Sequence, residues 1–418
     1  MEGLQVFEDW FDGAGAGATA DDCTSKSIPL ETLEVSSCPN ITSLFLADVR
    51  LEALRKLRIE GCPNLISLGG LQQVESGIEK FQLIVSEVVI DDPSLLPTVS
   101  VAYLEKLTIC NNDVLLSFPI EVEQWFPHVS SSLRELSFRG LKSLQSIPSS
   151  LERLSSLKIL RVEDVPQLQQ LLHIPASLEE LHLELLKSLQ CLPTDLSAIL
   201  SLERLELECI PLLKPFPDLP SSLKSLTLWF LYNIECLPSS LSAISSLEQL
   251  QLCKIQLLKS LPSLPSSLAS LKLYWLYNLE CLPTSLSAIS SLKQLELYKI
   301  PLLKSLPDLP SSLYSLFLHE LDNLECLPSS LSAISSLKFL ELEYIPLLKS
   351  LPDLPSSLHS LELSNLDNLH CLPSSLSAIS SLNRLKLESI PLLKSLPNLP
   401  SSLNYVNINS LNNLASTD

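Results

Sequence analysis

The stretch Leu292-Lys293-Gln294-Leu295-Glu296-Leu297 carries the pattern that decides the fold. Leu295 and Leu297 alternate with polar residues, as a half-buried strand requires, because successive side chains of a strand point to opposite faces. The apolar residues that follow, Ile300 and Leu303, are spaced to close a coil behind the strand. One such coil cannot bury its own leucines, so the pattern predicts that successive coils stack on one another.

The L-x-x-L-x-L pattern recurs seventeen times along the 418 residues. The units open at Leu30, Leu54, Ile78, Leu104, Leu133, Leu157, Leu178, Leu202, Leu223, Leu247, Leu268, Leu292, Leu313, Leu337, Leu358, Leu382 and Leu403. From Leu133 onward the spacing alternates between 24 and 21 residues, which makes a super-repeat of 45 residues. Before Leu133 the spacings are 24, 24, 26 and 29. We therefore predict an α/β repeat protein, a solenoid in the form of an arc with about 17 repeats and a parallel sheet on its concave face.

The convex face is predicted to hold short helical, 3₁₀ or extended segments, because the two coil lengths differ there. The 24-residue coils carry segments such as Pro238–Ser246, whose serines we expect to cap a short helical or 3₁₀ turn. The 21-residue coils carry segments such as Leu306–Ser312, in which two prolines favour an extended path.

The chain is predicted to consist of a short flexible segment and one repeat domain. Residues 1–27 include a Gly-Ala-Gly-Ala-Gly run, which is typical of a linker. Residues 28–418 form the repeat domain, irregular over 28–132 and regular, in 45-residue double repeats, over 133–418. Neither end shows an obvious polar cap, so we expect open apolar ends and self-association through them.

Composition and charge exclude several classes of function. Lys and Arg number 28 and Asp and Glu number 47, so the net charge of −19 argues against nucleic acid or an anionic membrane as a partner. No apolar run reaches the ~18 residues of a membrane helix, and the first residues lack the basic-then-apolar pattern of a secretory signal. Eleven cysteines without such a signal favour a reduced, cytoplasmic setting over a disulfide scaffold.

The sequence offers no convincing catalytic or metal motif. Cysteines recur every 45 residues, but two coils lie roughly 9.6 Å apart, too far for a disulfide or a shared zinc ion, and we interpret these cysteines as core residues. They are Cys191, Cys236, Cys281, Cys326 and Cys371. Histidines occupy scattered repeat positions, without a nucleophile motif or an H-E-x-x-H motif. We predict that the protein is not an enzyme and has no catalytic residues, no cofactor and no metal site.

Two segments of the irregular part resemble the leucine-rich repeats of plant intracellular immune receptors. They are Ser37–Leu44, with Ser-Cys-Pro-Asn-Ile-Thr-Ser-Leu, and Glu60–Leu68, with Glu-Gly-Cys-Pro-Asn-Leu-Ile-Ser-Leu. The family is that of the nucleotide-binding, leucine-rich-repeat (NLR) disease resistance proteins, and the resemblance covers about residues 28–418. It implies a leucine-rich-repeat fold and the sensing of pathogen proteins. No Gly-Lys pair occurs, so the phosphate-binding loop of the family's nucleotide-binding module is missing. The segment Leu306–Leu313 is also similar to the short repeats of bacterial secreted leucine-rich effectors.

Later units keep the asparagine of these motifs at one repeat position. We expect it to satisfy backbone groups of the turn rather than to bind a ligand. The residues concerned are Asn64, Asn233, Asn278, Asn323 and Asn368.

Two neighbouring super-repeats, residues 282–326 and 327–371, differ at only 9 of 45 positions. Six of the nine differences fall on the 8 positions expected to face outward from the sheet, where an even spread would place about 1.6 (9 × 8/45). Free drift of exposed residues would also change the exposed back, yet its Ser-Leu-Ser-Ala-Ile-Ser-Ser segment is identical. The bias indicates a surface that reads a partner.

The outward positions are unusually aromatic, and large rings on a rigid surface are favoured binding anchors. The predicted partner-binding residues of the concave face are Trp229, Phe230, Tyr274, Trp275, Tyr298, Lys299, Phe317, His319, Glu320, Phe339, Glu341 and Tyr344. A largely acidic rim is expected from Arg204, Glu206, Glu208, Glu296, Glu341, Glu343, Glu362, Arg384 and Glu388. The same glutamates could simply keep a leucine-rich protein soluble, and the rings could cover one another as cross-strand pairs.

We predict a protein-recognition module of the plant intracellular immune receptor type, which serves disease resistance, defense and innate immunity. Its partner would be a pathogen effector, a guarded host protein or the nucleotide-binding domain of a receptor. The alternative is a non-sensing structural scaffold, or a truncated receptor fragment without a specific ligand.

Overall fold

The computed structural model divides the chain into two compact units, residues 1–193 and 194–418. It describes residues 30–44, 53–68, 72–74, 77–79, 82–83, 85–98, 100–101, 103–172, 174–193, 196–411 and 413–414. The segment 1–27, predicted to be flexible, lies outside the described residues. Each unit is a stack of coils, and each coil contributes one short strand to a parallel ladder.

The first unit contains seven strands of this ladder, each paired in parallel with the next. They are β1 (Thr32–Ser36), β2 (Lys56–Glu60), β6 (Glu87–Ile90), β8 (Lys106–Cys110), β9 (Glu135–Arg139), β10 (Ile159–Glu163) and β11 (Glu180–Glu184). Two short pairs lie outside the ladder: β3 (Gln72–Val74) with β4 (Gly77–Glu79), antiparallel, and β5 (Gln82–Leu83) with β7 (Ser100–Val101), parallel.

The second unit contains ten strands, again paired in sequence order and all parallel. They are β12 (Arg204–Glu208), β13 (Ser225–Trp229), β14 (Gln249–Cys253), β15 (Ser270–Tyr274), β16 (Gln294–Tyr298), β17 (Ser315–His319), β18 (Phe339–Glu343), β19 (Ser360–Ser364), β20 (Arg384–Glu388) and β21 (Tyr405–Asn409). With the seven of the first unit they make the seventeen predicted repeats.

The third repeat lies elsewhere than predicted. The unit expected to open at Ile78 opens at Val85, because β6, and not the segment after Ile78, pairs with β2 and β8. Ile78 belongs to β4 of the antiparallel pair. Both segments carry the apolar pattern, so periodicity could not separate them. The β-branched Val88-Val89-Ile90 run is the better strand former, which explains the outcome.

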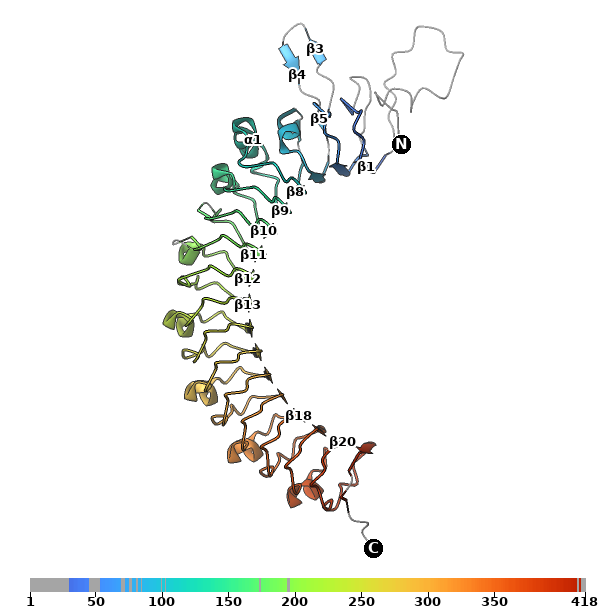
Figure 1. Cartoon of the computed structure of the whole chain (residues 1–418), viewed down its shortest axis with the longest axis vertical. Helices are drawn as coiled ribbons and strands as arrows, with labels where there is room; N and C mark the ends of the chain where they lie inside the picture. Colours follow the sequence, from blue (N-terminus) through green and yellow to red (C-terminus); the bar gives the residue numbers. More distant parts are fainter. Residues whose placement is uncertain are drawn as a thin grey trace, which may run out of the picture. The chain divides into compact units, whose positions relative to one another are not determined.

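The backs of the coils hold short helical turns, which in each unit lie on the side opposite the strands (Figure 1). The first unit has η2 (Pro93–Thr98), α1 (Ile120–Trp125), η3 (Phe126–Val129) and η4 (Ser149–Arg153). The second has η5 (Leu196–Ala198), η6 (Ser239–Ala243), η7 (Thr284–Ala288), η8 (Ser329–Ala333) and η9 (Ser374–Ala378). The predicted alternation is confirmed, since residues 306–310 of a 21-residue coil contain no helix. No helix among the described residues is long and apolar enough to cross a membrane.

The serines of the backs have another role than the predicted one. Pro238 occupies the N-cap position of η6, without a side-chain capping bond. Ser246 instead donates its hydroxyl to the carbonyl oxygen of Ser221, in the coil before, at 2.6 Å, and to that of Leu223, which opens its own coil, at 2.8 Å. Ser312 donates in the same way to Ile289 of the coil before at 3.3 Å and to Leu292 of its own coil at 2.8 Å. The hydroxyls therefore bind neighbouring coils to one another, and they satisfy carbonyls that the turns leave free.

The leucines of the pattern form the core, as predicted. Leu295 and Leu297 of β16 are fully buried. Leu297 pairs with Leu318 of β17, and Leu318 pairs with Leu342 of β18, so equivalent leucines form continuous rows. The prediction that the repeated asparagines satisfy backbone groups is confirmed for four of the five. Asn278, Asn323 and Asn368 each donate Nδ2 to a backbone oxygen of the preceding coil at 2.5–2.7 Å, and Asn64 does the same at 2.7 Å.

The periodic cysteines do not lie in the core, so that interpretation was wrong. Cys236, Cys281, Cys326 and Cys371 are exposed and Cys191 is half-buried, all as free thiols. In Cys281 the reason is alternation: Leu282 beside it points inward and is buried, so the thiol points outward.

The inward-position residues of β21 are exposed, in contrast to those of the strand before it. Val406 and Ile408 are 45% and 41% exposed, while Leu385 and Leu387 of β20 are buried completely. Self-association through this face stays a prediction, which light scattering of the purified chain would test.

Candidate functional site

The predicted binding residues lie on the solvent face of strands β13 to β18 or directly after these strands, and none of them is buried. Seven are strand residues: Trp229, Tyr274, Tyr298, Phe317, His319, Phe339 and Glu341. The other five directly follow a strand: Phe230, Trp275, Lys299, Glu320 and Tyr344. The Leu-x-Leu alternation explains the first group, because neighbours of an inward leucine must point outward.

The residues that follow the strands share an unusual backbone conformation. Trp275 has a φ of 52°, and every other member of this group lies between 49° and 58°, a region that costs an L-residue roughly 1–2 kcal/mol. The geometry is retained because the amide continues the ladder: Trp275 N–H donates to the Tyr298 carbonyl at 2.9 Å, and Lys299 N–H donates to His319 at 2.9 Å. Successive side chains of this row are therefore held beside one another along the sheet.

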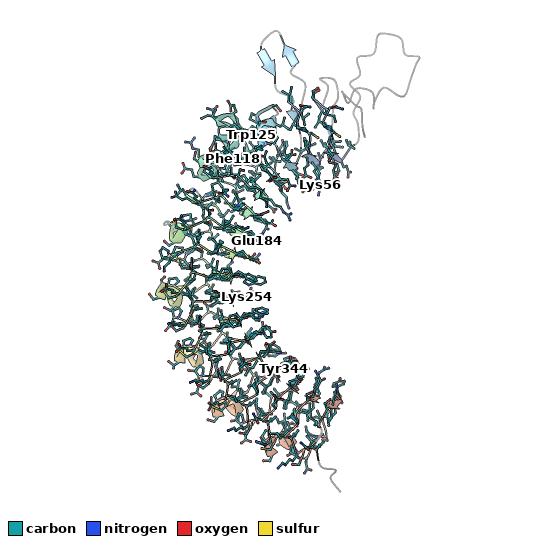
Figure 2. All side chains as sticks on the ribbon, in the orientation of Figure 1. Lys56, Phe118, Trp125, Glu184, Lys254 and Tyr344 are labelled. Atoms are coloured by element: carbon teal, nitrogen blue, oxygen red, sulfur yellow. The ribbon has the colours of Figure 1, made fainter. Side chains whose placement is uncertain are left out.

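Lys254 belongs to the same row but was missing from the predicted site. Its ammonium lies 4.8 Å from the centre of the Phe230 ring and 5.4 Å from that of Trp275. Figure 2 labels Lys254 and Tyr344 on the strand side of the second unit. The spacing of the repeats contained the signal, since Lys254 is the residue directly after β14, as Phe230 is after β13. The row thus places a cation between two aromatic rings.

Several predicted rings form one contiguous cluster. Trp275 packs edge-on against Tyr298, with centroids 4.8 Å apart and an interplanar angle of 84°. Tyr274 lies 6.1 Å from Trp275, and the His319 ring lies 6.4 Å from Tyr298. These distances are typical of attractive aromatic pairs. The rings therefore cover one another in part and still present a half-buried apolar surface.

Other rings lie apart from this cluster. Phe339 is the first residue of β18, and it packs at 5.4 Å against Tyr314, which precedes β17 and was not predicted as a site residue. The indole nitrogen of Trp229 is buried without a hydrogen-bond partner. Ring-to-ring contacts that involve the predicted rings thus form one cluster at the ends of the strands and one separate pair at their beginning.

Polar bonds fix the edge of the ring cluster. The Tyr298 hydroxyl donates to Glu320 at 2.6 Å, and the Lys299 ammonium lies 2.9 Å from the same carboxylate. These two hydrogen bonds lower the pKa of Glu320, and the bond to Glu320 raises the pKa of Tyr298. Burial, and then the nearby Glu296, raise the pKa of Tyr274. At neutral pH the edge therefore carries an ionised Glu320 between neutral tyrosine and cationic lysine.

Much of the acidic rim is neutralised within the sheet. Glu362 pairs with Arg384 at 2.8 Å, Glu388 with Lys386 at 2.9 Å, and Glu296 with Lys272 at 3.9 Å. The partners lie on neighbouring strands or two residues apart on one strand, so the pairs follow from the register. The surface is consequently less acidic than the sequence alone indicated.

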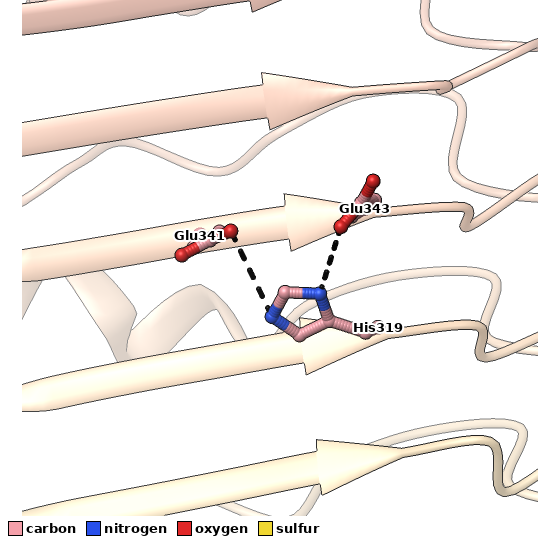
Figure 3. A group of neighbouring side chains, drawn as sticks. All are labelled: His319, Glu341 and Glu343. Atoms are coloured by element: carbon pink, nitrogen blue, oxygen red, sulfur yellow. Dashed lines mark hydrogen bonds and ion pairs between the residues drawn. The ribbon is translucent and has the colours of Figure 1, made fainter.

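One group of charged residues on this face could hold a metal ion. His319 lies at the end of β17, and Glu341 and Glu343 lie on β18 beside it (Figure 3). Nδ1 of His319 is 3.1 Å from Glu343 Oε2, and Nε2 is 4.0 Å from Glu341 Oε1. Burial, together with the negative charges of Glu362 and Glu343, raises the pKa of Glu341, although His319 acts in the opposite direction. In the part of the chain that the structure describes, no other group of this kind was found.

Solved structures similar to this chain include leucine-rich-repeat proteins of different organisms. A leucine-rich repeat protein from Bacteroides eggerthii is 12% identical, over 90% of this chain and 64% of its own, with a TM-score of 0.50. A chain of the Toll–Spatzle complex of Drosophila is 19% identical, over 77% of this chain and 44% of its own, also with a TM-score of 0.50. YopM, a leucine-rich effector protein from Yersinia pestis, is 27% identical, over 68% of this chain and 83% of its own, with a TM-score of 0.42.

No protein-family model matches the sequence, and no curated protein matches it either. The parallel ladder and the first two of these similarities establish the fold, a leucine-rich-repeat solenoid.

Proposed function

We propose that this chain recognises a protein through the exposed face of β13 to β18, as the sensing module of a cytoplasmic immune receptor of the plant type. A leucine-rich-repeat fold suggests a protein-interaction module, and the finer assignment rests on the sequence motifs around Cys38 and Cys62. Its partner would be a pathogen effector, a guarded host protein or a receptor's nucleotide-binding domain. The nucleotide-binding module itself is not part of the proposal.

A single observation carries the proposal: the differences between two nearly identical super-repeats fall on one face. Six of the nine differing positions lie on the solvent face or directly after the strands, and none of the six is buried: 294, 298, 299, 317, 319 and 320. The leucines beneath them are unchanged, as packing requires.

Free drift of exposed residues does not account for this bias. Ser287, Ala288 and Ser290 on the back of the coil are exposed, and the next super-repeat has the same residues at these positions. On the helical back only Thr284 differs, and its counterpart is the similar Ser329, while six positions of the strand face differ. This is the pattern expected of a surface that discriminates between partners.

The side chains of this face indicate the chemistry of the partner. The cluster around Trp275 and Tyr298 offers rigid aromatic area, and the Lys254 ammonium already occupies the space between the Phe230 and Trp275 rings. A partner segment with apolar side chains would therefore suit this surface. By analogy, the Toll chain, of the same fold, was solved in complex with the protein Spatzle.

The test compares two single substitutions in the full chain. Trp275→Ala removes the central ring, and Ser287→Ala changes an exposed residue on the back and is the control. Proteins cross-linked to each variant in pathogen-challenged plant tissue are identified, and each candidate is then purified and titrated against the chain. We expect a partner whose affinity falls about 30-fold or more in Trp275→Ala, as for a binding anchor worth 2 kcal/mol, and is unchanged in Ser287→Ala. Partners that bind both variants equally, or none at all, would favour the scaffold or fragment alternative.

A further inference from the structure

We propose that His319, Glu341 and Glu343 form a binding site for a divalent transition-metal ion of the zinc type. Each residue offers one ligand atom, and these atoms all lie within 4.8 Å of one another. No metal site is expected from the sequence alone, because the histidines are scattered along the chain. In the folded chain, however, the parallel register of β17 and β18 places His319 directly beside Glu343, and Phe317 beside Glu341.

The geometry requires only side-chain rotation to bind an ion. Zinc lies about 2.0–2.2 Å from imidazole nitrogen and carboxylate oxygen, so tetrahedral ligands lie roughly 3.4 Å from each other. The present separations, 3.1 Å between His319 Nδ1 and Glu343 and 4.0 Å between Nε2 and Glu341, lie on either side of that value. The His319 ring would turn so that one nitrogen faces both carboxylates. The two strands would keep their positions, since the ladder bonds hold them.

The local charge favours a dication. Glu341 and Glu343 lie on the same face of β18, and Glu362 of β19 is the register partner of Glu341, so like charges stand directly opposite each other. Arg384 forms an ion pair with Glu362, whereas the group that faces Glu341 across the strands is the His319 imidazole, 4.0 Å away. A bound dication would compensate the negative charge of the two β18 carboxylates more fully than the imidazole does.

The ligand types indicate which ion fits. Imidazole with two carboxylates suits zinc and its neighbours among the transition metals, while calcium and magnesium prefer oxygen ligands alone. Three protein ligands leave a fourth position of a tetrahedral ion open. The His319, Glu341 and Glu343 side chains are 19%, 35% and 35% exposed, so that position would face solvent. An ion here could therefore accept a further ligand from outside the chain.

The neighbouring repeats provide internal comparisons. Two strands earlier, the positions of His319, Glu341 and Glu343 hold Tyr274, Glu296 and Tyr298, and two strands later they hold Ser364, Lys386 and Glu388. Neither set offers an imidazole with two carboxylates. The trio thus arises where this face differs between super-repeats, on a scaffold that is otherwise almost the same. The proposal does not depend on the proposed protein partner, because the three ligands belong to one chain.

The test measures metal binding to the full chain by calorimetric titration with Zn²⁺, and by the absorption spectrum with Co²⁺. His319→Ser and Glu343→Gln each remove one ligand. His370→Ser and Glu280→Gln make the same chemical changes at exposed positions of other coils, and they are the controls. We expect one Zn²⁺ site whose affinity falls at least about tenfold in each ligand variant, which corresponds to about 1.4 kcal/mol, and is unchanged in both controls.

Two further readouts separate this site from loss of folding and from the exposed cysteines. Zn²⁺ should raise the melting temperature of the wild type but not that of His319→Ser, whose circular dichroism without metal should equal that of the wild type. The Co²⁺ site lost in His319→Ser should lack thiolate-to-metal absorption. Equal Zn²⁺ affinity in wild type and His319→Ser, or a lost site that carries the thiolate absorption, would overturn the proposal.

Discussion

The indole of Trp275 packs edge-on against the ring of Tyr298, with centroids 4.8 Å apart, across two neighbouring coils. An aromatic pair of this kind contributes about 0.5–1.5 kcal/mol beyond the area that it buries. We expect a double-mutant cycle of Trp275→Ala and Tyr298→Ala, measured by urea unfolding, to give a coupling energy in that range. Strictly additive effects would mean that the two rings are not in contact in solution. The loss of an interaction of this size should not unfold the chain. The Trp275→Ala variant can therefore report on partner binding.

The core leucines should be far more sensitive. Leu297 is fully buried between coils, so Leu297→Ala should lower the free energy of unfolding by about 2–5 kcal/mol through the cavity that it leaves. Leu302, in the same coil, is 39% exposed and is the matched control. We expect the urea midpoint to fall markedly for Leu297→Ala and much less for Leu302→Ala. Equal shifts would contradict the inward assignment of Leu297.

Adjacent serines should differ in the same way. Ser336 donates its hydroxyl to the Ser311 carbonyl of the preceding coil at 2.5 Å and to the Leu313 carbonyl at 2.8 Å, whereas Ser335 beside it is exposed. Ser336→Ala should therefore cost about 1 kcal/mol of the free energy of unfolding, and Ser335→Ala should change it by less than about 0.5 kcal/mol. Urea unfolding of both variants measures the difference. If the order were reversed, the serine rows would not be what binds coil to coil.

One buried thiol should make stability fall at alkaline pH. Burial, and then the hydrogen bond from the Cys110 thiol to Glu60 at 3.1 Å, raise the pKa of Cys110 to about 12. A thiol in the unfolded chain ionises near ~8.5. Because the folded pKa is the higher one, the contribution of Cys110 is fully present below about pH 8.5 and is lost as the pH rises toward about 12.

The measurement compares the wild type with Cys110→Ala by urea unfolding at pH 8 and at pH 10. The wild type should lose on the order of 1–2 kcal/mol more than the variant over this interval. Other groups titrate in both proteins alike, so the difference isolates Cys110. Parallel losses in the two proteins would show that the thiol is not buried as described.

The sequence alone predicted where the strands of the parallel ladder lie, with one exception, and which of their residues point inward. The alternation of leucine with polar residues determines the face of each residue, and the strict 24- and 21-residue spacing determines the register. That register already places residue 319 beside residue 343, so the histidine and glutamate of the proposed metal site were within reach of sequence reasoning. The exception is the third repeat, where the segments after Ile78 and Val85 carry the same pattern.

The tertiary structure decided how side chains with the same orientation share the surface. Periodicity assigns a face to a residue, but it does not say which neighbour the side chain contacts, since that depends on rotamers and on charges from adjacent coils. Only the coordinates show Lys254 between two rings, Glu362 bound to Arg384, and Glu341 without a comparable partner.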